Sequence, residues 1–241
     1  MKALIFAAGL GTRLKPLTDI KPKALVEVNG ITLLEHTINK LKNAAVDEII
    51  VNVHHFADQI KTFLKLKNYF NINIEISDES EQLLDTGGGL KKASWFFNDN
   101  KAFFVYNVDV ISDINLRELY QYHINNNSLA TLAVKHRETS RYFLFDQALQ
   151  LCGWKNIKTN EVKISNESAK NLTPLAFSGI QLVNPDIFKL IIETGKFSLT
   201  ETYLSLAKHN KISGYRHDND FWLDLGKAEM IKKGEEYLNK K

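Results

Sequence analysis

Short apolar segments alternate with amphipathic stretches along the first 110 residues, and this alternation restricts the chain to a small number of folds. Strands that alternate with helices form βαβ units around a parallel sheet. A segment that is apolar throughout, such as 102–107, is typical of a central strand covered on both faces. The pattern therefore predicts an α/β fold. The expected strands are residues 2–7, 48–54, 72–77 and 102–107, and the expected helices are residues 31–45, 57–66 and 89–97, the last starting at the third of three consecutive glycines.

The second half of the chain changes character. Strand-like pieces follow one another between residues 141 and 183 with polar turns between them, which predicts a partly antiparallel extension of the sheet. Thr32 and Ser198 each precede a glutamate by three residues, the spacing of a helix N-cap. We find no internal repeat and no linker, so a single domain over 1–241 is expected. The other predicted elements are helices at 116–124, 185–193, after Ser198 and at 226–239, and strands at 129–136 and 211–217.

Charge and cysteine content limit the partners and the compartment. The chain has 241 residues and a formal net charge of +3, with no basic stripe, so a nucleic-acid partner is not indicated. The single cysteine, Cys152, fits a buried core residue in a reducing compartment. No apolar run is long enough to span a bilayer, and the N-terminal run ends without a signal-peptidase pattern. We expect a cytoplasmic protein without a membrane partner.

The turn "AAGLGTRLKPL" follows the first expected strand and can bind phosphate. Glycines let backbone N–H groups approach an anion, and the fork of Arg13 matches phosphate oxygens. A P-loop would need lysine and then serine or threonine where Arg13 and Leu14 stand. A dinucleotide fingerprint would need a third glycine at position 14 and an acidic residue after the second strand, which reads "VNVHHF". From these residues alone, a phosphate-binding turn and a plain tight turn both stay open.

The longer strings "LIFAAGLGTRLKPLT" and "KPKALVEVNG" resemble the signature of the sugar-1-phosphate nucleotidylyltransferases. The second string has Ala24 where the family has proline and retains Lys23. The resemblance implies a Rossmann-like three-layer αβα nucleotide-diphospho-sugar transferase fold with a mixed, mainly parallel sheet. It also implies a nucleotide-binding part over about 1–110 and a sugar-phosphate-binding part over about 111–241. The resemblance further implies that Arg13 and Lys23 are catalytic and that the opening turn binds the nucleotide through Ala8, Gly9, Gly11 and Thr12.

Two further segments match the nucleotide half of the family. "LLDTGGGL" is a second glycine-rich turn, and the resemblance places Thr86, Gly87 and Gly88 against the nucleoside, with Gln82 at the pyrimidine edge. "FFVYNVDV" ends a buried strand, where an α/β sheet presents its ligands. There the family has a magnesium-binding aspartate, which the resemblance identifies as Asp109, and the resemblance implies that Asn107 binds the nucleotide. Val108 replaces a family glycine, and nearby Asp113 is interpreted as a helix cap.

Two segments of the second half complete the resemblance. "FSGIQLV" carries Gly179, which it places near the sugar, and "FWLDLGK" carries Asp224 in the family's W-x-D-x-G pattern. Asp109 and Asp224 would form a two-carboxylate site, which suits Mg²⁺ that keeps waters and bridges phosphates. Candidates to hold the sugar phosphate are Lys170, Arg141 and Lys155.

The implied reaction joins a nucleoside triphosphate to a sugar 1-phosphate and releases pyrophosphate. The interpretation that fits the motifs best is UTP with N-acetylmuramate 1-phosphate, and a guanylyltransferase for mannose or heptose 1-phosphate is the alternative. A glycosyltransferase of the related fold would show a D-x-D metal motif, which "DVISD" does not supply. A non-catalytic nucleotide-sugar sensor would be expected to lack Arg13, Lys23 or Asp109. A monomer or a homodimer is expected.

Overall fold

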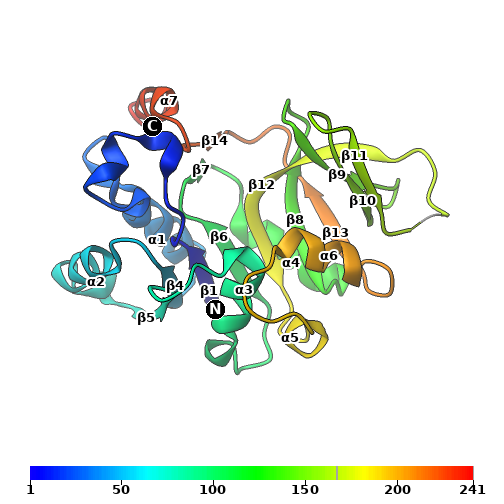
Figure 1. The fold of residues 1–241 in the computed structure, drawn as a ribbon, viewed down its shortest axis with the longest axis horizontal. Coiled ribbons are helices and arrows are strands. Elements are labelled where there is room, and N and C mark those ends of the chain that lie inside the picture. Colours follow the sequence, from blue (N-terminus) through cyan, green and yellow to red (C-terminus); the bar gives the residue numbers. More distant parts are fainter. Residues whose placement is uncertain (167, 241) are drawn as a thin grey trace.

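The computed structural model describes residues 1–166 and 168–240 and contains one ten-stranded sheet (Figure 1). Eight strands follow one another in the order β11-β10-β9-β12-β6-β1-β4-β5, while β8 pairs with β12 and β13 pairs with β8. The strands of this sheet are β1 (Lys2–Phe6), β4 (Glu48–Val53), β5 (Asn73–Asp78), β6 (Phe103–Asn107), β8 (Ala130–Lys135), β9 (Arg141–Phe145), β10 (Leu151–Asn156), β11 (Glu161–Ile164), β12 (Thr173–Val183) and β13 (Ile212–Arg216).

The parallel part of the sheet places the loops that could bind a ligand. β1 pairs in parallel with β4 on one side and with β6 on the other, and β4 pairs in parallel with β5. The chain therefore builds outward from β1 through β4 and β5, and then returns to the other side of β1 for β6. In such sheets a crevice opens beyond the carboxyl ends of the strands where the order reverses. Here that point lies after Phe6 and Asn107.

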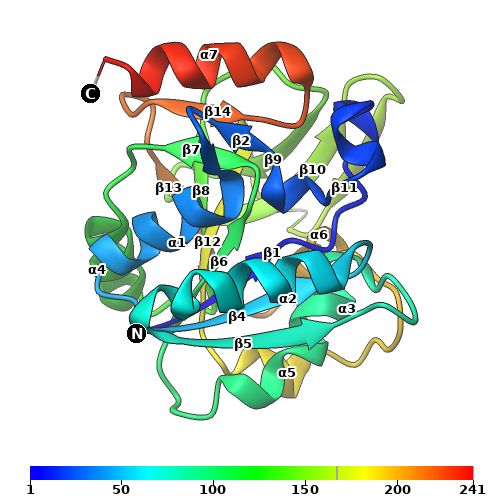
Figure 2. The same ribbon diagram turned by 90° about the vertical axis from the view of Figure 1, so that its left-hand side faces the viewer.

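Helices cover both faces of the sheet because its central strands are apolar on both faces. Ala3 and Ile5 of β1 belong to one hydrophobic core, and Leu4 between them belongs to the other. Figure 2 shows α1 and α7 on one side of the strands and α3 and α5 on the other. The α-helices are α1 (Leu33–Asn43), α2 (Ala57–Leu66), α3 (Asp85–Lys92), α4 (Leu116–Asn126), α5 (Ile187–Leu190), α6 (Leu199–Leu206) and α7 (Ala228–Leu238).

Beyond β6 the sheet becomes mixed, as the runs between 141 and 183 predict. The long strand β12 is antiparallel to β6, β8 and β9, and β9, β10 and β11 continue as an antiparallel meander. The expected mixed αβα fold is therefore confirmed. Shorter elements complete it: strands β2 (Glu27–Val28), β3 (Ile31–Thr32), β7 (Val110–Ser112) and β14 (Trp222–Asp224), and 3₁₀ turns η1 (Thr12–Leu14), η2 (Leu17–Asp19), η3 (Lys23–Leu25), η4 (Asn68–Asn71) and η5 (Ser94–Phe96).

The helix caps divide into confirmed and wrong predictions. The side chains of Thr32 and Ser198 accept hydrogen bonds from the backbone N–H groups of Glu35 and Thr200, so both caps are confirmed. Asp113 was expected to cap α4, but Asn115 does so. Asp113 instead accepts hydrogen bonds from the Phe221 N–H and the Tyr237 hydroxyl, because β14 and α7 pack beside it.

Two predicted helix positions are also wrong. The helix expected over 89–97 begins at Asp85 and ends at Lys92, so the three glycines lie inside α3. Glycine is a poor helix former, but Gly87 and Gly88 pack so closely on residues 195–197, and Gly89 on Glu79 and Asn52, that a Cβ atom would not fit at these positions. The helix expected over 185–193 is only the single turn α5.

Among the described residues, no helix combines the length and the apolar character that crossing a membrane would require.

Candidate active site

A pocket of about 360 Å³ lies at the carboxyl edge of the parallel strands, where the strand order reverses. Its walls come from the ends of β1, β4 and β6, from the loops after β1, β5 and β6, from the start of α3, from the turn at η3 and from the loop before α6. This is the position where an α/β sheet binds its ligand. The lining residues are Phe6, Ala7, Ala8, Gly9, Lys23, Asn52, Glu79, Leu83, Asp85, Thr86, Asn107, Val108, Asp109 and Lys196.

A buried amide fixes the first turn of the pocket. The Oδ1 atom of Asn52 accepts hydrogen bonds from the N–H groups of Ala7 (2.7 Å) and Ala8 (3.2 Å). Its Nδ2 atom donates to Oε1 of Glu79 at 2.8 Å, and Oε2 of Glu79 accepts from the N–H of Leu84 at 3.0 Å. Asn52 and Glu79 are almost completely buried. The pair therefore ties the β1 turn to the segment that leads into α3.

The rest of the opening turn is shaped by Gly11. This glycine has a φ of +63°, which side chains rarely adopt. A Cβ atom there would also lie 2.8 Å from Cγ2 of Thr18, whose hydroxyl donates a hydrogen bond to the Gly11 carbonyl oxygen. The turn into η1 therefore requires glycine at position 11. It leads directly to Thr12 and to Arg13, whose side chain is exposed.

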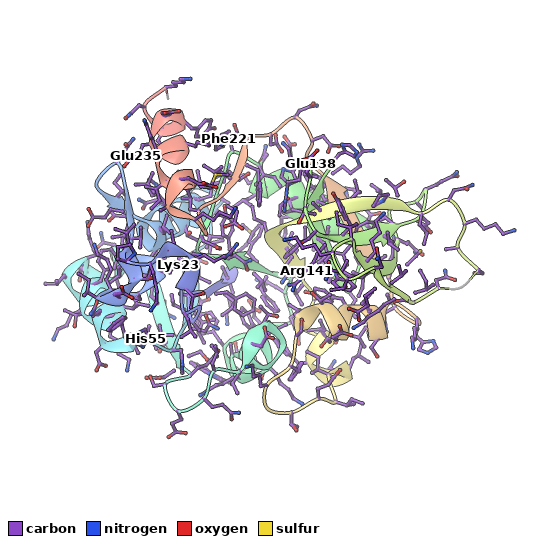
Figure 3. The ribbon with its side chains drawn as sticks, turned by 45° about the horizontal axis from the view of Figure 1, so that its top comes forward. Lys23, His55, Glu138, Arg141, Phe221 and Glu235 are labelled. Atoms are coloured by element: carbon purple, nitrogen blue, oxygen red, sulfur yellow. The ribbon has the colours of Figure 1, made fainter. Side chains whose placement is uncertain are left out.

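Lys23 reaches from η3 to the end of β6. Its Nζ atom forms an ion pair with Oδ2 of Asp109, and both side chains are mostly buried. The N–H of Val108 donates to the carbonyl oxygen of Phe6 at 3.1 Å, which keeps the β6 loop against β1. Lys23 is labelled in Figure 3, in the N-terminal half of the molecule. The lysine and the aspartate that the family motifs pair in function are thus in direct contact.

Asp224 comes to the same place from the end of the chain. The N–H of Leu225 donates to the carbonyl oxygen of Asp109 at 2.8 Å, which joins β14 to the β6 loop. Burial raises the pKa of Asp224, the negative charge of Asp109 raises it further, and the positive charges of Lys23 and Arg13 oppose both effects. A Cβ atom on Gly226 would lie 2.7 Å from both Nη2 of Arg13 and Oδ1 of Asp224. Two cations and two carboxylates, distant in sequence, therefore lie close together, and two of the four, Lys23 and Asp109, line the pocket.

The remaining predicted residues fall into two groups. Ala8, Gly9, Thr86 and Asn107 line the pocket. Gly179, with a φ of +73°, packs so closely on Asn107 that a Cβ atom would lie 3.0 Å from its Nδ2. Seven predicted nucleotide or sugar contacts do not line the pocket in this structure: Gly11, Thr12, Gln82, Gly87, Gly88, Lys170 and Gly179, of which Gln82 and Lys170 are exposed. Arg13 and Asp224 lie beside the lining residues Lys23 and Asp109 and are not part of the lining themselves.

Gly87 and Gly88 pack α3 against the loop that precedes α6. The N–H groups of Gly87 and Gly88 both point to the carbonyl oxygen of Phe197, at 2.9 and 3.3 Å. The hydroxyl of Thr86 accepts a hydrogen bond from the N–H of Leu199, at the start of α6. The segment "DTGGGL" therefore joins α3 to the loop before α6, and that loop brings Lys196 to the pocket wall.

Sequence reasoning missed Asn52, Glu79 and Lys196. Asn52 carried a signal, because a single polar residue in the apolar run "EIIVNV" needs a buried partner. Glu79 and Lys196 carried no such signal, since only the packing of β4, β5 and the loop before α6 brings them to the pocket.

Comparison with known proteins gives the family. A family model described as "Nucleotidyl transferase" matches residues 2–241. The chain belongs to the nucleotidyl transferase family. The resemblance inferred from the opening motifs is thereby confirmed, and so is the expectation of an enzyme of this class.

Two curated relatives of this nucleotidyl transferase illustrate the family. The chain is 32% identical over 233 residues to the N-acetylmuramate alpha-1-phosphate uridylyltransferase of Caulobacter vibrioides, covering 93% of this chain and 91% of the relative. It is 34% identical over 238 residues to the mannose-1-phosphate guanyltransferase 2 of Candida glabrata, covering 97% of this chain. The chain spans only 63% of that guanyltransferase's length.

Solved structures share the fold of this nucleotidyl transferase at lower identity. A UDP-glucose pyrophosphorylase solved with UDP-glucose superposes with a TM-score of 0.81 at 18% identity, covering 100% of this chain and 99% of the other. HddC from Yersinia pseudotuberculosis, solved with GMP-PN, gives a TM-score of 0.76 at 22% identity, covering 98% and 99%.

Proposed function

We propose that this protein transfers a nucleotidyl group from a nucleoside triphosphate to a sugar 1-phosphate and releases pyrophosphate. The observation that carries the proposal is the convergence of Arg13, Lys23, Asp109 and Asp224 at the pocket that the opening turn forms. The family supports a nucleotidyl transfer, and the two curated relatives both act, by their names, on a sugar 1-phosphate.

The transfer of a nucleotidyl group depends on charge stabilisation more than on proton transfer. The nucleophile is a phosphate oxygen that is already anionic at neutral pH, so no general base is required. The chain must hold two anions together and stabilise the charge that grows on the transferred phosphorus and on the leaving pyrophosphate. We propose that Arg13, which is exposed and lies near Asp224, binds the departing pyrophosphate. Lys23, now paired with Asp109, can move its ammonium to the transferred phosphoryl group.

A divalent cation, Mg²⁺ by preference, fits the two carboxylates. Burial raises the pKa of Asp224, and repulsion from the neighbouring carboxylate of Asp109 raises it further. A cation between the two carboxylates would relieve this repulsion. The ammonium of Lys23 already provides one positive charge against Asp109. Mg²⁺ is commonly held by one or two carboxylates together with substrate phosphates. We propose that Asp109 and Asp224 hold it, where it would neutralise charge on the triphosphate.

For the substrates, we propose UTP and N-acetylmuramate 1-phosphate. The Caulobacter vibrioides relative, which carries this activity in its name, matches the chain over 91% of its own length. GTP with mannose 1-phosphate is the alternative, because the identity to the Candida glabrata guanyltransferase is 34%.

A pyrophosphate-release screen tests the proposal. Four nucleoside triphosphates are each paired with N-acetylmuramate, N-acetylglucosamine, mannose and glucose 1-phosphates, with Mg²⁺ and with EDTA. We expect turnover that depends on Mg²⁺, highest with UTP and N-acetylmuramate 1-phosphate. Turnover with GTP and mannose 1-phosphate alone would select the alternative, and no turnover with any pair would contradict the transferase function.

A further inference from the structure

A second cavity of about 360 Å³ lies outside the triphosphate pocket, between the end of β8 and the hairpin of β9 and β10. Arg137, Glu138, Tyr142, Lys155 and Pro174 are among the residues that line it, and we call it the Arg137 groove. It belongs to the C-terminal half of the molecule, where Figure 3 shows Glu138.

Arg137 is held beside the carboxylate cluster of the candidate active site. Its guanidinium carbon lies 4.0 Å from the centre of the Trp222 ring, and its Nη2 atom donates a 2.8 Å hydrogen bond to the carbonyl oxygen of Phe177. Trp222 is fixed in turn, since its Nε1 atom donates to the carbonyl oxygen of Ser178 at 2.7 Å. Trp222 and Asp224 are two residues apart on β14, so their side chains leave the same face of the strand. The negative charge of Asp224 acts on the Arg137 guanidinium, so the arginine of the groove lies near the carboxylate cluster.

The charges in the groove are incompletely matched. Among the described residues, no carboxylate oxygen lies within 4.0 Å of a nitrogen of Arg137 or Lys155. The Nε atom of Arg137 is buried and has no hydrogen-bond partner in the described part of the chain. Lys155 Nζ lies 5.5 Å from the Tyr142 ring centre. Burial lowers the pKa of Arg137, and the negative charge of Asp224 opposes this shift. A half-buried cation that no carboxylate pairs with directly is costly, and a bound anion would offset that cost.

We propose that the Arg137 groove binds an anionic group of the acceptor sugar 1-phosphate, with Arg137 as the residue that sets acceptor affinity. This inference rests on the proposed function. Lys23 and Lys196 line the first pocket and Arg13 lies near Asp224, whereas Arg137 lies near Asp224 with a guanidinium that has donors to spare. The acceptor brings a second anion that must reach the same carboxylate cluster. Glu138 is the acidic residue in the groove wall, and its negative charge opposes the binding of an anion. Removing this charge should therefore strengthen acceptor binding, whereas removing the charge of Arg137 should weaken it.

Substitutions at Arg137 separate acceptor binding from triphosphate binding. Arg137→Met keeps an unbranched chain over Trp222 and removes the charge, and Arg137→Lys restores the charge. Losing a charge-assisted hydrogen bond is worth about 1.5–3 kcal/mol, which is roughly a 10- to 100-fold rise in the KM for the acceptor. We expect that rise in Arg137→Met, with the KM for the triphosphate within about twofold of wild type, and partial rescue in Arg137→Lys. Lys158→Met, in the adjacent hairpin turn, is the matched control and should change neither constant.

The purely structural alternative predicts a different pattern. If Arg137 served only to hold Trp222 and Asp224, Arg137→Met would raise the KM for the triphosphate and the Mg²⁺ requirement, and leave the acceptor KM unchanged. That result would overturn the proposal. Glu138→Gln keeps Arg137 intact and is expected to lower the acceptor KM, which gives an independent reading if Arg137→Met folds poorly. An unchanged or raised acceptor KM in Glu138→Gln would count against the groove.

Two acceptors identify the anionic group that is bound. N-acetylmuramate 1-phosphate and N-acetylglucosamine 1-phosphate share the phosphate, and only the first carries a carboxylate. A loss of affinity in Arg137→Met for both sugars assigns the groove to the phosphate, and a loss confined to the first assigns it to the carboxylate. Unchanged affinity for both overturns the proposal.

Calorimetric titration of both sugar 1-phosphates, with Mg²⁺ and a non-hydrolysable triphosphate present, measures the acceptor affinity without turnover. If the screen found no turnover, the proposed function would fail on its own. Weaker sugar binding by Arg137→Met than by wild type would still support the groove, and equal or absent binding by both would overturn it.

Discussion

Lys23 and Asp109 form an ion pair that gives the most direct test at the scale of single residues. If Lys23 neutralises the transferred phosphoryl group and Asp109 helps to hold the metal, Lys23→Ala and Asp109→Ala should each lower turnover by at least about a hundredfold. This estimate follows the cost of removing one donor from an oxyanion site. Turnover is measured by pyrophosphate release and folding by circular dichroism. Lys65→Ala, an exposed lysine on α2, is the control. Near-normal rates in both folded variants would count heavily against these roles.

Asn52 makes a separate prediction, because its side chain is both a support and part of the pocket wall. Asn52→Ala leaves the N–H groups of Ala7 and Ala8 and one oxygen of Glu79 without their partner. Unsatisfied buried groups cost about 1–3 kcal/mol, so the free energy of unfolding in urea should fall by that amount. The KM for the triphosphate should rise, because the opening turn loses its anchor. Asn125→Ala, on the exposed face of α4, should show neither effect. If Asn52→Ala unfolded at the same urea concentration as the wild type, the Asn52–Glu79 pair would contribute little to stability.

At the scale of the elements, α3 shows why glycines stand inside a helix. A Cβ atom on Gly88 would lie 2.2 Å from the carbonyl oxygen of Gly195, so Gly88→Ala forces α3 and that loop apart. Overpacking costs about 1–3 kcal/mol, and the better helix propensity of alanine recovers up to about 1 kcal/mol. We therefore expect a net loss of roughly 1–2 kcal/mol in urea unfolding. Gly9→Ala, where nothing lies within 4 Å of the added Cβ, should keep wild-type stability. Equal stability of the two variants would contradict the close packing.

The contact between α4 and β8 predicts a pH dependence. His123 is buried, its Nδ1 atom lies 2.8 Å from the hydroxyl of Thr131, and burial lowers its pKa to about 4. In the unfolded chain its pKa is near 6.5, so between those values only the unfolded chain binds the proton. Stability should therefore fall as the pH decreases from 6.5 to 4, by roughly 1–3 kcal/mol for this group.

Chemical denaturation of wild type and His123→Gln across that range measures the effect of His123. The variant should show a shallower decline with acid. Parallel curves for the two proteins would show that His123 does not titrate as described. His217, whose pKa burial also lowers to about 4, should keep part of the slope in both.

At the scale of the whole molecule, the sequence predicted the framework well. The apolar strands and the caps at Thr32 and Ser198 were readable because each depends on local spacing. Four candidate site residues could be selected from the sequence because each lies in a short motif: Arg13, Lys23, Asp109 and Asp224. The structure brings these four residues together. The hydrogen bond between Asn52 and Glu79 could not be predicted from the sequence, because it depends on β4 lying beside β5. The helix around Gly87 and Gly88 was misread, because packing on residues 195–197 overrides local propensity.

The central claim is that Arg13, Lys23, Asp109 and Asp224 act on one triphosphate–metal complex. The most direct measurement is a crystal structure with Mg²⁺ and a non-hydrolysable triphosphate. We predict Arg13 and Lys23 within hydrogen-bond distance of phosphate oxygens, and both aspartates as metal ligands, directly or through water. A triphosphate bound elsewhere, or these four side chains turned away from it, would contradict the account.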